Sequence, residues 1–157
     1  MPTCLAKHSK ISSTKRLKPS HKVVLDTNII VSGLLTDLTP PGQVLDAWLE
    51  GGFTLVSSEW QLEEIRRISR YPRLRTRLKP HLVGRTVKQM RTKGIIVNVS
   101  TIPNISSDPD DNVIIATAFS GNADVLVSGD RGDLLSLGKV QHIPIVSARI
   151  FAEQLRL

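Results

Sequence analysis

Val23-Val24-Leu25-Asp26-Thr27-Asn28 is a short apolar run that ends in three polar residues. A run of Val and Leu bounded in this way is typical of a strand buried in the centre of a sheet. Around it, the pattern predicts strands at 22–26, 53–56, 95–99, 125–128 and 143–146. Segments with helical spacing lie between most of these strands. Strands that alternate with helices predict an α/β fold with a mostly parallel sheet.

Four helical segments are predicted from apolar spacing and from residues that begin or end helices. The first covers 44–49, the second starts at Ser57 or Ser58, the third opens at 108–111, and the last starts at Ser147. Residues 74–90 form an amphipathic basic segment that is interrupted near Pro80. Pro40-Pro41-Gly42 is interpreted as a loop.

The chain has 157 residues, enough for one domain. Residues 1–20 are rich in Ser, Lys and Pro, and we expect a basic disordered tail before a folded domain at 21–157. No run of 18 apolar residues and no secretory signal is found. The one cysteine, Cys4, excludes an internal disulfide, which suits a reducing cytoplasm.

The charges are sorted into blocks. Residues 66–93 hold eleven Lys or Arg and no acid, whereas residues 23–65 hold seven acids and no Lys or Arg. A basic block beside an acidic one favours a polyanion as the substrate, although a solvated helix face is the simpler alternative. The predicted nucleic-acid-binding residues are Arg66, Arg67, Arg70, Arg73, Arg75, Arg77 and Lys79.

Carboxylates lie where the strands are expected to end. Asp26 closes the first strand, Glu64 lies in the helix after the second, and Asp130 follows the fourth. Asp108, Asp110 and Asp111 open a helix, with Asp111 expected to lie deepest. Because strands of a parallel sheet end at one edge, these acids can meet there. Such a cluster repels itself unless it holds a cation, and oxygen ligands suit Mg²⁺ or Mn²⁺.

Each acid also has a simpler interpretation. Asp26-Thr27-Asn28 can cap a helix or form a turn, one of the three aspartates can cap a helix, and Asp130 can belong to a turn. Three aspartates are more than capping needs, which favours the metal site. The histidines and Cys4 lack the spacing of metal ligands, and no Gly-x-Ser-x-Gly or phosphate-binding loop is found.

Four motifs together resemble the PIN domain family of metal-dependent ribonucleases over residues 22–157. They are Val24-Leu25-Asp26-Thr27-Asn28, Glu64-Ile65, the run that Asp111 opens, and Ser128-Gly129-Asp130, with Ser128 where Thr is commoner. Arg70-Tyr71-Pro72-Arg73-Leu74 and Asp108-Pro109-Asp110-Asp111 are similar to a bacterial subfamily classed as toxins of toxin–antitoxin pairs. Gly132 looks like an added residue after the last acid.

The resemblance implies a three-layer, Rossmann-like fold with a five-stranded sheet of order 3-2-1-4-5, frequent dimers and often an antitoxin partner. In the expected site, Asp26, Glu64, Asp111 and Asp130 bind Mg²⁺ or Mn²⁺, with help from Asp108 or Asp110. The expected supporting residues are Thr27, Asn28 and Ser128.

The expected activity is metal-dependent cleavage of single-stranded RNA in the cytoplasm. The alternatives are a non-catalytic module that binds RNA or a partner, a receiver-like signalling domain, and a Mg²⁺-dependent phosphatase. The phosphatase would need an Asp where Asn28 stands.

Overall fold

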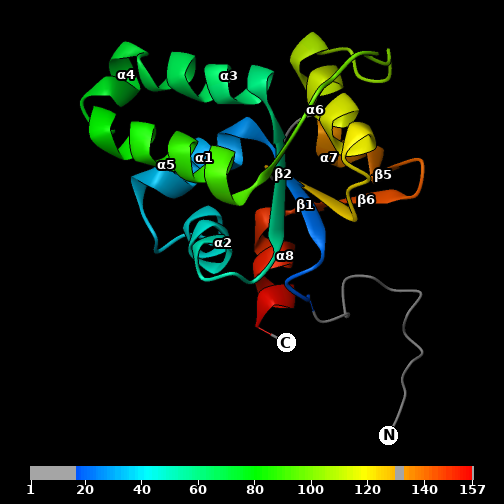
Figure 1. Cartoon of the computed structure of the whole chain (residues 1–157), viewed down its shortest axis with the longest axis horizontal. Helices are drawn as coiled ribbons and strands as arrows, with labels where there is room; N and C mark the ends of the chain where they lie inside the picture. The colour runs from blue at the N-terminus through cyan, green and yellow to red at the C-terminus, as the bar shows by residue number, and fades with distance from the viewer. Residues whose placement is uncertain (1–16, 130–132, 157) are drawn as a thin grey trace, which may run out of the picture.

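The structure is a computed structural model that describes residues 17–129 and 133–156. Its described strands form a six-stranded sheet in the order β3-β2-β1-β4-β6-β5, with helices on both faces (Figure 1). The strands are β1 (Lys22–Leu25), β2 (Thr54–Ser58), β3 (Ile95–Val97), β4 (Val125–Ser128), β5 (Lys139–Val140) and β6 (Ile143–Ser147). The α/β class predicted from the sequence is confirmed.

The sheet is parallel except at one edge. β1 lies in the centre and pairs in parallel with β2 and β4, and β6 pairs in parallel with β4. β5 pairs antiparallel with β6 across a turn that contains Gln141 at φ 53°. The predicted five strands are present in the predicted order, but the prediction of five was wrong. The sixth, β5, has two residues and is too short to leave an alternating pattern.

The helices differ from the predicted ones in two respects: no helix was predicted over 27–35 or 133–137, and proline begins several of the observed helices. Pro40 begins α2 (Pro40–Leu49), where a loop was predicted, and Pro72 and Pro80 begin α4 (Pro72–Arg75) and α5 (Pro80–Lys93). Proline suits the first turn of a helix because the N–H that it lacks would have no partner there. The remaining helices are α1 (Thr27–Leu35), α3 (Glu59–Ser69), α6 (Pro109–Ser120), α7 (Asp133–Leu137) and α8 (Ala148–Leu155).

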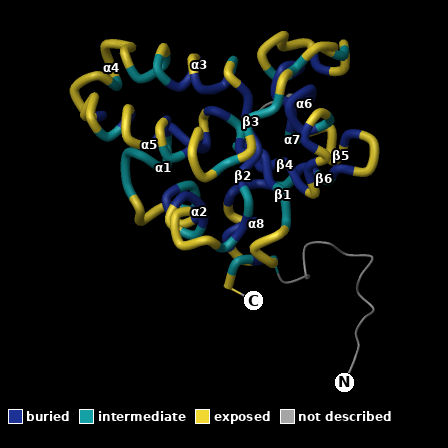
Figure 2. The backbone as a smooth tube through the Cα atoms, in the orientation of Figure 1, coloured by how far each residue is buried: buried dark blue, intermediate teal, exposed yellow. Residues whose placement is uncertain are grey.

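Two apolar cores lie on the two faces of the sheet. Val23 and Leu25 of β1 pack into the core formed with α1, α2, α3, α5 and α8, whereas Val24 packs into the core formed with α6 and α7. Figure 2 shows the buried strands between the helical layers. A strand that is covered on both faces needs apolar residues at consecutive positions, which explains the run at 23–25.

The predicted tail overlaps the described chain at residues 17–20. Leu17 packs against the core, and the Thr54 hydroxyl donates a hydrogen bond to the Pro19 carbonyl at 2.7 Å. Residues 1–16 and Cys4 lie outside the described part. None of the described helices has the length and apolarity needed to span a membrane.

Candidate functional site

A cleft of about 220 Å³ opens at the carboxyl end of the central strands. It lies between the start of α1, the middle and end of α3, and the start of α6. Its lining includes four aspartates, one glutamate and, among the described residues, one cation. The lining residues are Asp26, Thr27, Asn28, Glu64, Arg67, Ile68, Tyr71, Asp108, Asp110, Asp111 and Ile114. Among the described residues, the fold thus brings Asp26, Glu64 and the three aspartates at 108–111 to one cleft.

Asp26 is held at the junction of β1 and α1. Its backbone N–H donates to the Val127 carbonyl at 2.8 Å, and the Ser128 hydroxyl donates to its Oδ2 at 3.1 Å. The side chain makes no N-cap hydrogen bond to α1, although Asp26 occupies the N-cap position. Capping therefore does not explain this carboxylate.

Burial raises the pKa of Asp26, and the negative charge of Asp108 adds to the rise. Hydrogen bonds from Ser128 and from the Thr27 backbone N–H oppose it. Burial outweighs these bonds because it removes water from the charged form. Without a cation, Asp26 is thus held in an environment that disfavours its ionised state.

Glu64 enters the cleft from α3 and is 7% exposed. The Thr27 hydroxyl donates to its Oε1 at 2.6 Å, and Arg67 Nη2 lies 3.3 Å from its Oε2. Burial raises the pKa of Glu64, and Asp110 and Asp26 raise it further, while Thr27 and Arg67 lower it. The Glu64 carboxylate is therefore affected by the negative charges of Asp110 and Asp26, which come from other segments of the cleft.

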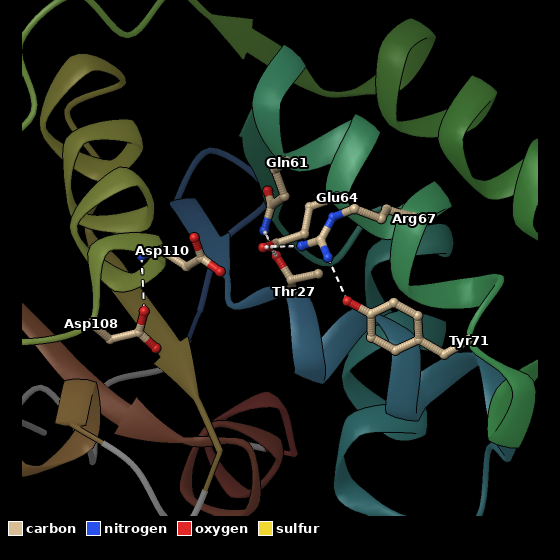
Figure 3. A network of polar contacts seen from close by, with 7 residues as sticks. All are labelled: Thr27, Gln61, Glu64, Arg67, Tyr71, Asp108 and Asp110. Carbon is tan, nitrogen blue, oxygen red and sulfur yellow. Dashed lines mark hydrogen bonds and ion pairs between the residues drawn. The ribbon is translucent and has the colours of Figure 1, made fainter.

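Gln61 holds Thr27 and the end of β1 in place through hydrogen bonds. Its side chain is fully buried, and its Nε2 donates to the Leu25 carbonyl at 2.6 Å and to the Thr27 hydroxyl at 3.4 Å. Its Oε1 accepts a hydrogen bond from the Ser57 hydroxyl at 2.6 Å. Figure 3 shows Gln61 beside Thr27 and Glu64. The end of β1, the start of α1 and helix α3 are therefore joined by one amide.

The three aspartates at the start of α6 have different roles. Asp108 is the N-cap residue and accepts a hydrogen bond from the Asp110 N–H at 3.0 Å, so capping explains part of its presence. Asp111 accepts a hydrogen bond from the Ser106 hydroxyl at 3.3 Å and is the least exposed of the three, as predicted. Asp110 is exposed, and its carboxylate projects from α6 toward the Thr27–Glu64 contact (Figure 3).

Arg67 brings a cation into the cleft. Besides its contact with Glu64, its guanidinium donates to the Tyr71 hydroxyl and lies 5.8 Å from the centre of the Tyr71 ring. Arg67 was predicted as a nucleic-acid-binding residue, but the sequence did not reveal its place among the acids. Gln61 and Tyr71 were also missed. Gln61 precedes Glu64 by three residues and Arg67 and Tyr71 follow it by three and seven, and this helical spacing is the signal that could have found them.

Asn28 is an exposed residue at the rim of the cleft. It was predicted to support Asp26, but within the described residues the hydrogen bond to Asp26 comes from Ser128. Thr27, also predicted as a supporting residue, donates to Glu64. Asp130 lies outside the described residues, as does Gly132.

The donor set suits a hard divalent cation, because carboxylate oxygens are the ligands that Mg²⁺ and Mn²⁺ prefer. Burial, with a smaller effect of neighbouring carboxylates, raises the pKa of Asp26 and of Glu64, and a bound cation would favour the ionised form of both. Within residues 17–129 and 133–156, however, no three His, Cys, Asp or Glu side chains are close enough together to hold a metal ion by themselves. The chemistry of the lining therefore fits a metal, and the spacing of its described carboxylates is wider than a closed metal site.

The other predicted nucleic-acid-binding residues extend from α3 to the start of α5. Arg66 is partly buried and pairs with the exposed Glu63 at 3.0 Å. The others are exposed and make no ion pair within the described part of the chain. They are Arg70, Arg73, Arg75, Arg77 and Lys79.

Comparison with known proteins agrees with this geometry. A family model described as PIN domain matches residues 22–132. An uncharacterised protein of Methanocaldococcus jannaschii, MJ1680, is 32% identical over 117 residues, which cover 74% of each chain. The family has a nuclease-type fold, and its members typically use divalent metal ions. The matched span contains the strands and helices that form the cleft, and the chain belongs to the PIN domain family.

Proposed function

We propose that this protein is a metal-dependent endoribonuclease that cleaves phosphodiester bonds of single-stranded RNA. One observation carries the proposal. Carboxylates from three distant segments, the end of β1, helix α3 and the start of α6, line one cleft at the carboxyl end of the sheet. This is the edge at which open α/β sheets bind their ligands.

In this proposal, Asp26, Glu64, Asp111 and Asp130 hold one or two Mg²⁺ or Mn²⁺ ions, with Asp108 or Asp110 assisting. The bound metal would lower the pKa of a water molecule and stabilise charge on the phosphate. Ser128 orients the Asp26 carboxylate, and Thr27 orients that of Glu64. Gln61 of α3 holds the end of β1 in position by donating a hydrogen bond to the Leu25 carbonyl. These residues act by positioning, which is the main requirement of phosphoryl chemistry.

RNA is proposed as the substrate because a positively charged segment, residues 66–93, adjoins the acidic cleft. Eleven Lys or Arg and no acid occur in residues 66–93, which begin on the helix that carries Glu64. Contacts of Lys and Arg with phosphates supply most of the affinity for a nucleic acid that is not read by sequence. An acidic cleft alone would repel this substrate, so the adjacent bases are needed to bind it.

The decisive experiment is cleavage of defined single-stranded RNAs in Mg²⁺, in Mn²⁺ and in EDTA, with wild type compared to Asp26→Asn. We expect cleavage by wild type in either metal, none in EDTA, and a loss of at least about 100-fold in Asp26→Asn. Circular dichroism establishes that the variant is folded. Cleavage that persists in EDTA, or in the folded variant, would contradict the proposed mechanism.

A non-catalytic module that binds RNA or a partner is the second candidate. The observation that favours it is the ion pair of Arg67 with Glu64, together with the wide spacing of the described acids. The same RNA panel separates the two: binding without metal-dependent cleavage would identify the module. Turnover of para-nitrophenyl phosphate without RNA cleavage would identify a phosphatase.

We also propose, from the subfamily resemblance, that the ribonuclease is the toxin of a toxin–antitoxin pair and acts as a dimer in the cytoplasm. The test is a search for a small gene directly upstream, followed by induced expression with and without any such gene. Growth arrest that requires Asp26 and is relieved by that gene is the expected result. Unaffected growth would separate the nuclease from the toxin role, and size-exclusion chromatography with light scattering gives the oligomeric state.

A further inference from the structure

A second pocket, of about 320 Å³, lies between α3, α4 and α5. Three of its lining residues are arginines, and the others are apolar or small. The arginines are Arg66, Arg70 and Arg75, and the others are Ser69, Leu78, Pro80, Val83 and Gly84. In Figure 1 the same three helices form one green group at the side of the molecule. The pocket therefore presents guanidinium groups around an apolar floor.

The positive charge of this pocket is largely uncompensated. Within the described residues, Arg70 and Arg75 make no ion pair, and Arg66 pairs with the exposed Glu63 at the helix surface. Leu78 and Val83 are 3% and 5% exposed and belong to the core, so the floor of the pocket is apolar. Guanidinium groups bind phosphate by paired, charge-assisted hydrogen bonds, which are stronger where water is scarce. The pocket thus has the chemistry of an anion site.

The pocket and the acidic cleft lie on different faces of α3. Glu64, Arg67 and Tyr71 line the cleft, whereas Arg66 and Arg70 line the pocket. At 3.6 residues per turn these two sets are centred roughly 120° apart around a helix of about 10–12 Å in diameter. Arg67 is exposed at the cleft, and Arg70 follows three residues later at the pocket. A strand of polyanion can therefore pass from one to the other over the outer surface of α3.

We propose that the pocket of Arg66, Arg70 and Arg75 binds a phosphate group of the RNA strand whose scissile bond lies in the cleft. The inference rests on the proposed function and adds a second contact to it. The group is either an internal backbone phosphate or a 5′-terminal phosphate, which share this chemistry. Because α3 separates the two sites, a short oligonucleotide reaches one of them and a longer one reaches both.

Gly84 offers a way to close the pocket without disturbing the fold. It lies in α5, and apart from its chain neighbours and the backbone of its own helix no atom lies within 4 Å of the position that a Cβ would take. Glutamate and alanine both favour helix over glycine, so neither substitution should destabilise α5. Gly84→Glu places a carboxylate at the pocket, and Gly84→Ala is its matched control. Arg70→Ala/Arg75→Ala removes two guanidinium groups, and Lys139→Ala/Arg156→Ala removes two exposed bases that lie outside both the pocket and the 66–93 block.

The test measures binding separately from cleavage. The affinity of fluorescein-labelled oligouridylates of 2 to 16 nucleotides, with and without a 5′-phosphate, is measured in EDTA by anisotropy over a range of salt concentrations. Poly-glutamate serves as an acidic polymer without phosphate. Parallel cleavage assays in Mn²⁺ report on the proposed function.

We expect Gly84→Glu and Arg70→Ala/Arg75→Ala to bind the longer RNAs roughly tenfold more weakly, a loss typical of charge-assisted bonds. The slope of log affinity against log salt should fall by about 0.7 for each lost phosphate contact. Gly84→Ala, the Lys139/Arg156 variant and the shortest RNAs should show little change. An effect restricted to 5′-phosphorylated RNA assigns the pocket to the terminal phosphate, and an effect on both assigns it to the backbone.

Equal loss in the matched variants, or equal binding of poly-glutamate, would overturn the phosphate pocket. Failure of the proposed function has a different signature. If wild type does not cleave RNA but the two pocket variants still weaken binding, the pocket stands and the nuclease falls. If wild type cleaves and the pocket variants bind and cleave normally, the nuclease stands and the pocket falls.

Discussion

The Thr27 hydroxyl donates a hydrogen bond of 2.6 Å to Glu64 Oε1, and so joins residues 37 positions apart at the mouth of the cleft. Thr27 is 3% exposed and Glu64 is 7% exposed, so water reaches this bond poorly. The bond connects the first residue of α1 to the middle of α3. Thr27 lies just after the end of β1, so this bond ties the position of the Glu64 carboxylate to the carboxyl end of the central strand.

Replacing Thr27 with Val should lower the free energy of unfolding by about 1.5–3 kcal/mol, the range for hydrogen bonds to charged groups. Val keeps the shape and the branched Cβ but leaves Glu64 without this donor. Urea denaturation at pH 7 measures the loss. Thr27→Ser keeps a hydroxyl and should recover most of it. A Val variant as stable as wild type would show that the bond contributes nothing net.

Gln61 should be more sensitive to substitution than Thr27. Gln61→Met keeps the length of the side chain but removes the donor to the Leu25 carbonyl and the acceptor of the Ser57 hydroxyl. Leaving buried polar groups without partners costs about 1–3 kcal/mol each, so we expect a loss of about 2–5 kcal/mol in urea denaturation. The control is Gln89→Met on α5, where the side chain is half-buried. Equal stability of the two variants would contradict the role of Gln61.

The central strands and the meeting of acids could be predicted because they follow from simple rules. Val23, Val24 and Leu25 must be apolar since the strand is covered on both faces. Parallel strands end at one edge, so the described acids that follow them line one cleft. Arg67 in the cleft could not be predicted with the same rules, because its place depends on how α3 is rotated about its axis. The short strand β5 depends on its pairing with β6, and two residues leave no pattern.

The pH dependence of the metal-free protein should reveal the cost of the acidic cleft. The pKa values of Asp26 and Glu64 are raised above their ordinary values of 3.8 and 4.5. Between the ordinary and the raised pKa, the folded protein binds more protons than the unfolded chain. The contribution of these groups to stability therefore falls as pH rises through that window and is lost above the raised pKa.

Asp26→Asn should accordingly stabilise the metal-free protein at pH 7, by about 1.4 kcal/mol for each unit by which the pKa is raised. Thermal unfolding in EDTA at pH 4 and pH 7 measures the effect, which should be larger at pH 7. Glu50→Gln, an exposed carboxylate at the end of α2, is the control and should change little. A destabilised Asp26→Asn at pH 7 would mean that the charge of Asp26 is favourable without metal.

Manganese should reverse this order of stability. A ligand that binds only the folded state at 100 times its Kd adds about 2.7 kcal/mol. Wild type should therefore gain several degrees in Tm with excess Mn²⁺, and EDTA should remove the gain. Asp26→Asn should gain much less because a ligand is missing. Identical Mn²⁺ shifts in both proteins would place the metal elsewhere.

Arg67 should weaken metal binding in the free protein. Its guanidinium lies 3.3 Å from Glu64 Oε2 and lowers the pKa of Glu64. Its positive charge therefore already neutralises part of the Glu64 charge and would repel a metal ion. Two unit charges 4 Å apart interact by about 1 kcal/mol even in water, and a divalent ion doubles this repulsion. Arg67→Gln should therefore tighten Mn²⁺ binding by roughly fivefold to tenfold in titration calorimetry.

Arg66→Gln is the matched control for Arg67. Arg66 also pairs with a glutamate three residues earlier, Glu63, but on a different face of α3. Its removal should leave Mn²⁺ affinity unchanged, since Glu63 does not line the cleft. RNA binding should fall in both variants, because each loses a base beside the path of the strand. Weaker Mn²⁺ binding in Arg67→Gln would instead show that Arg67 holds Glu64 in place for the metal, and its charge would then matter less than its hydrogen bond.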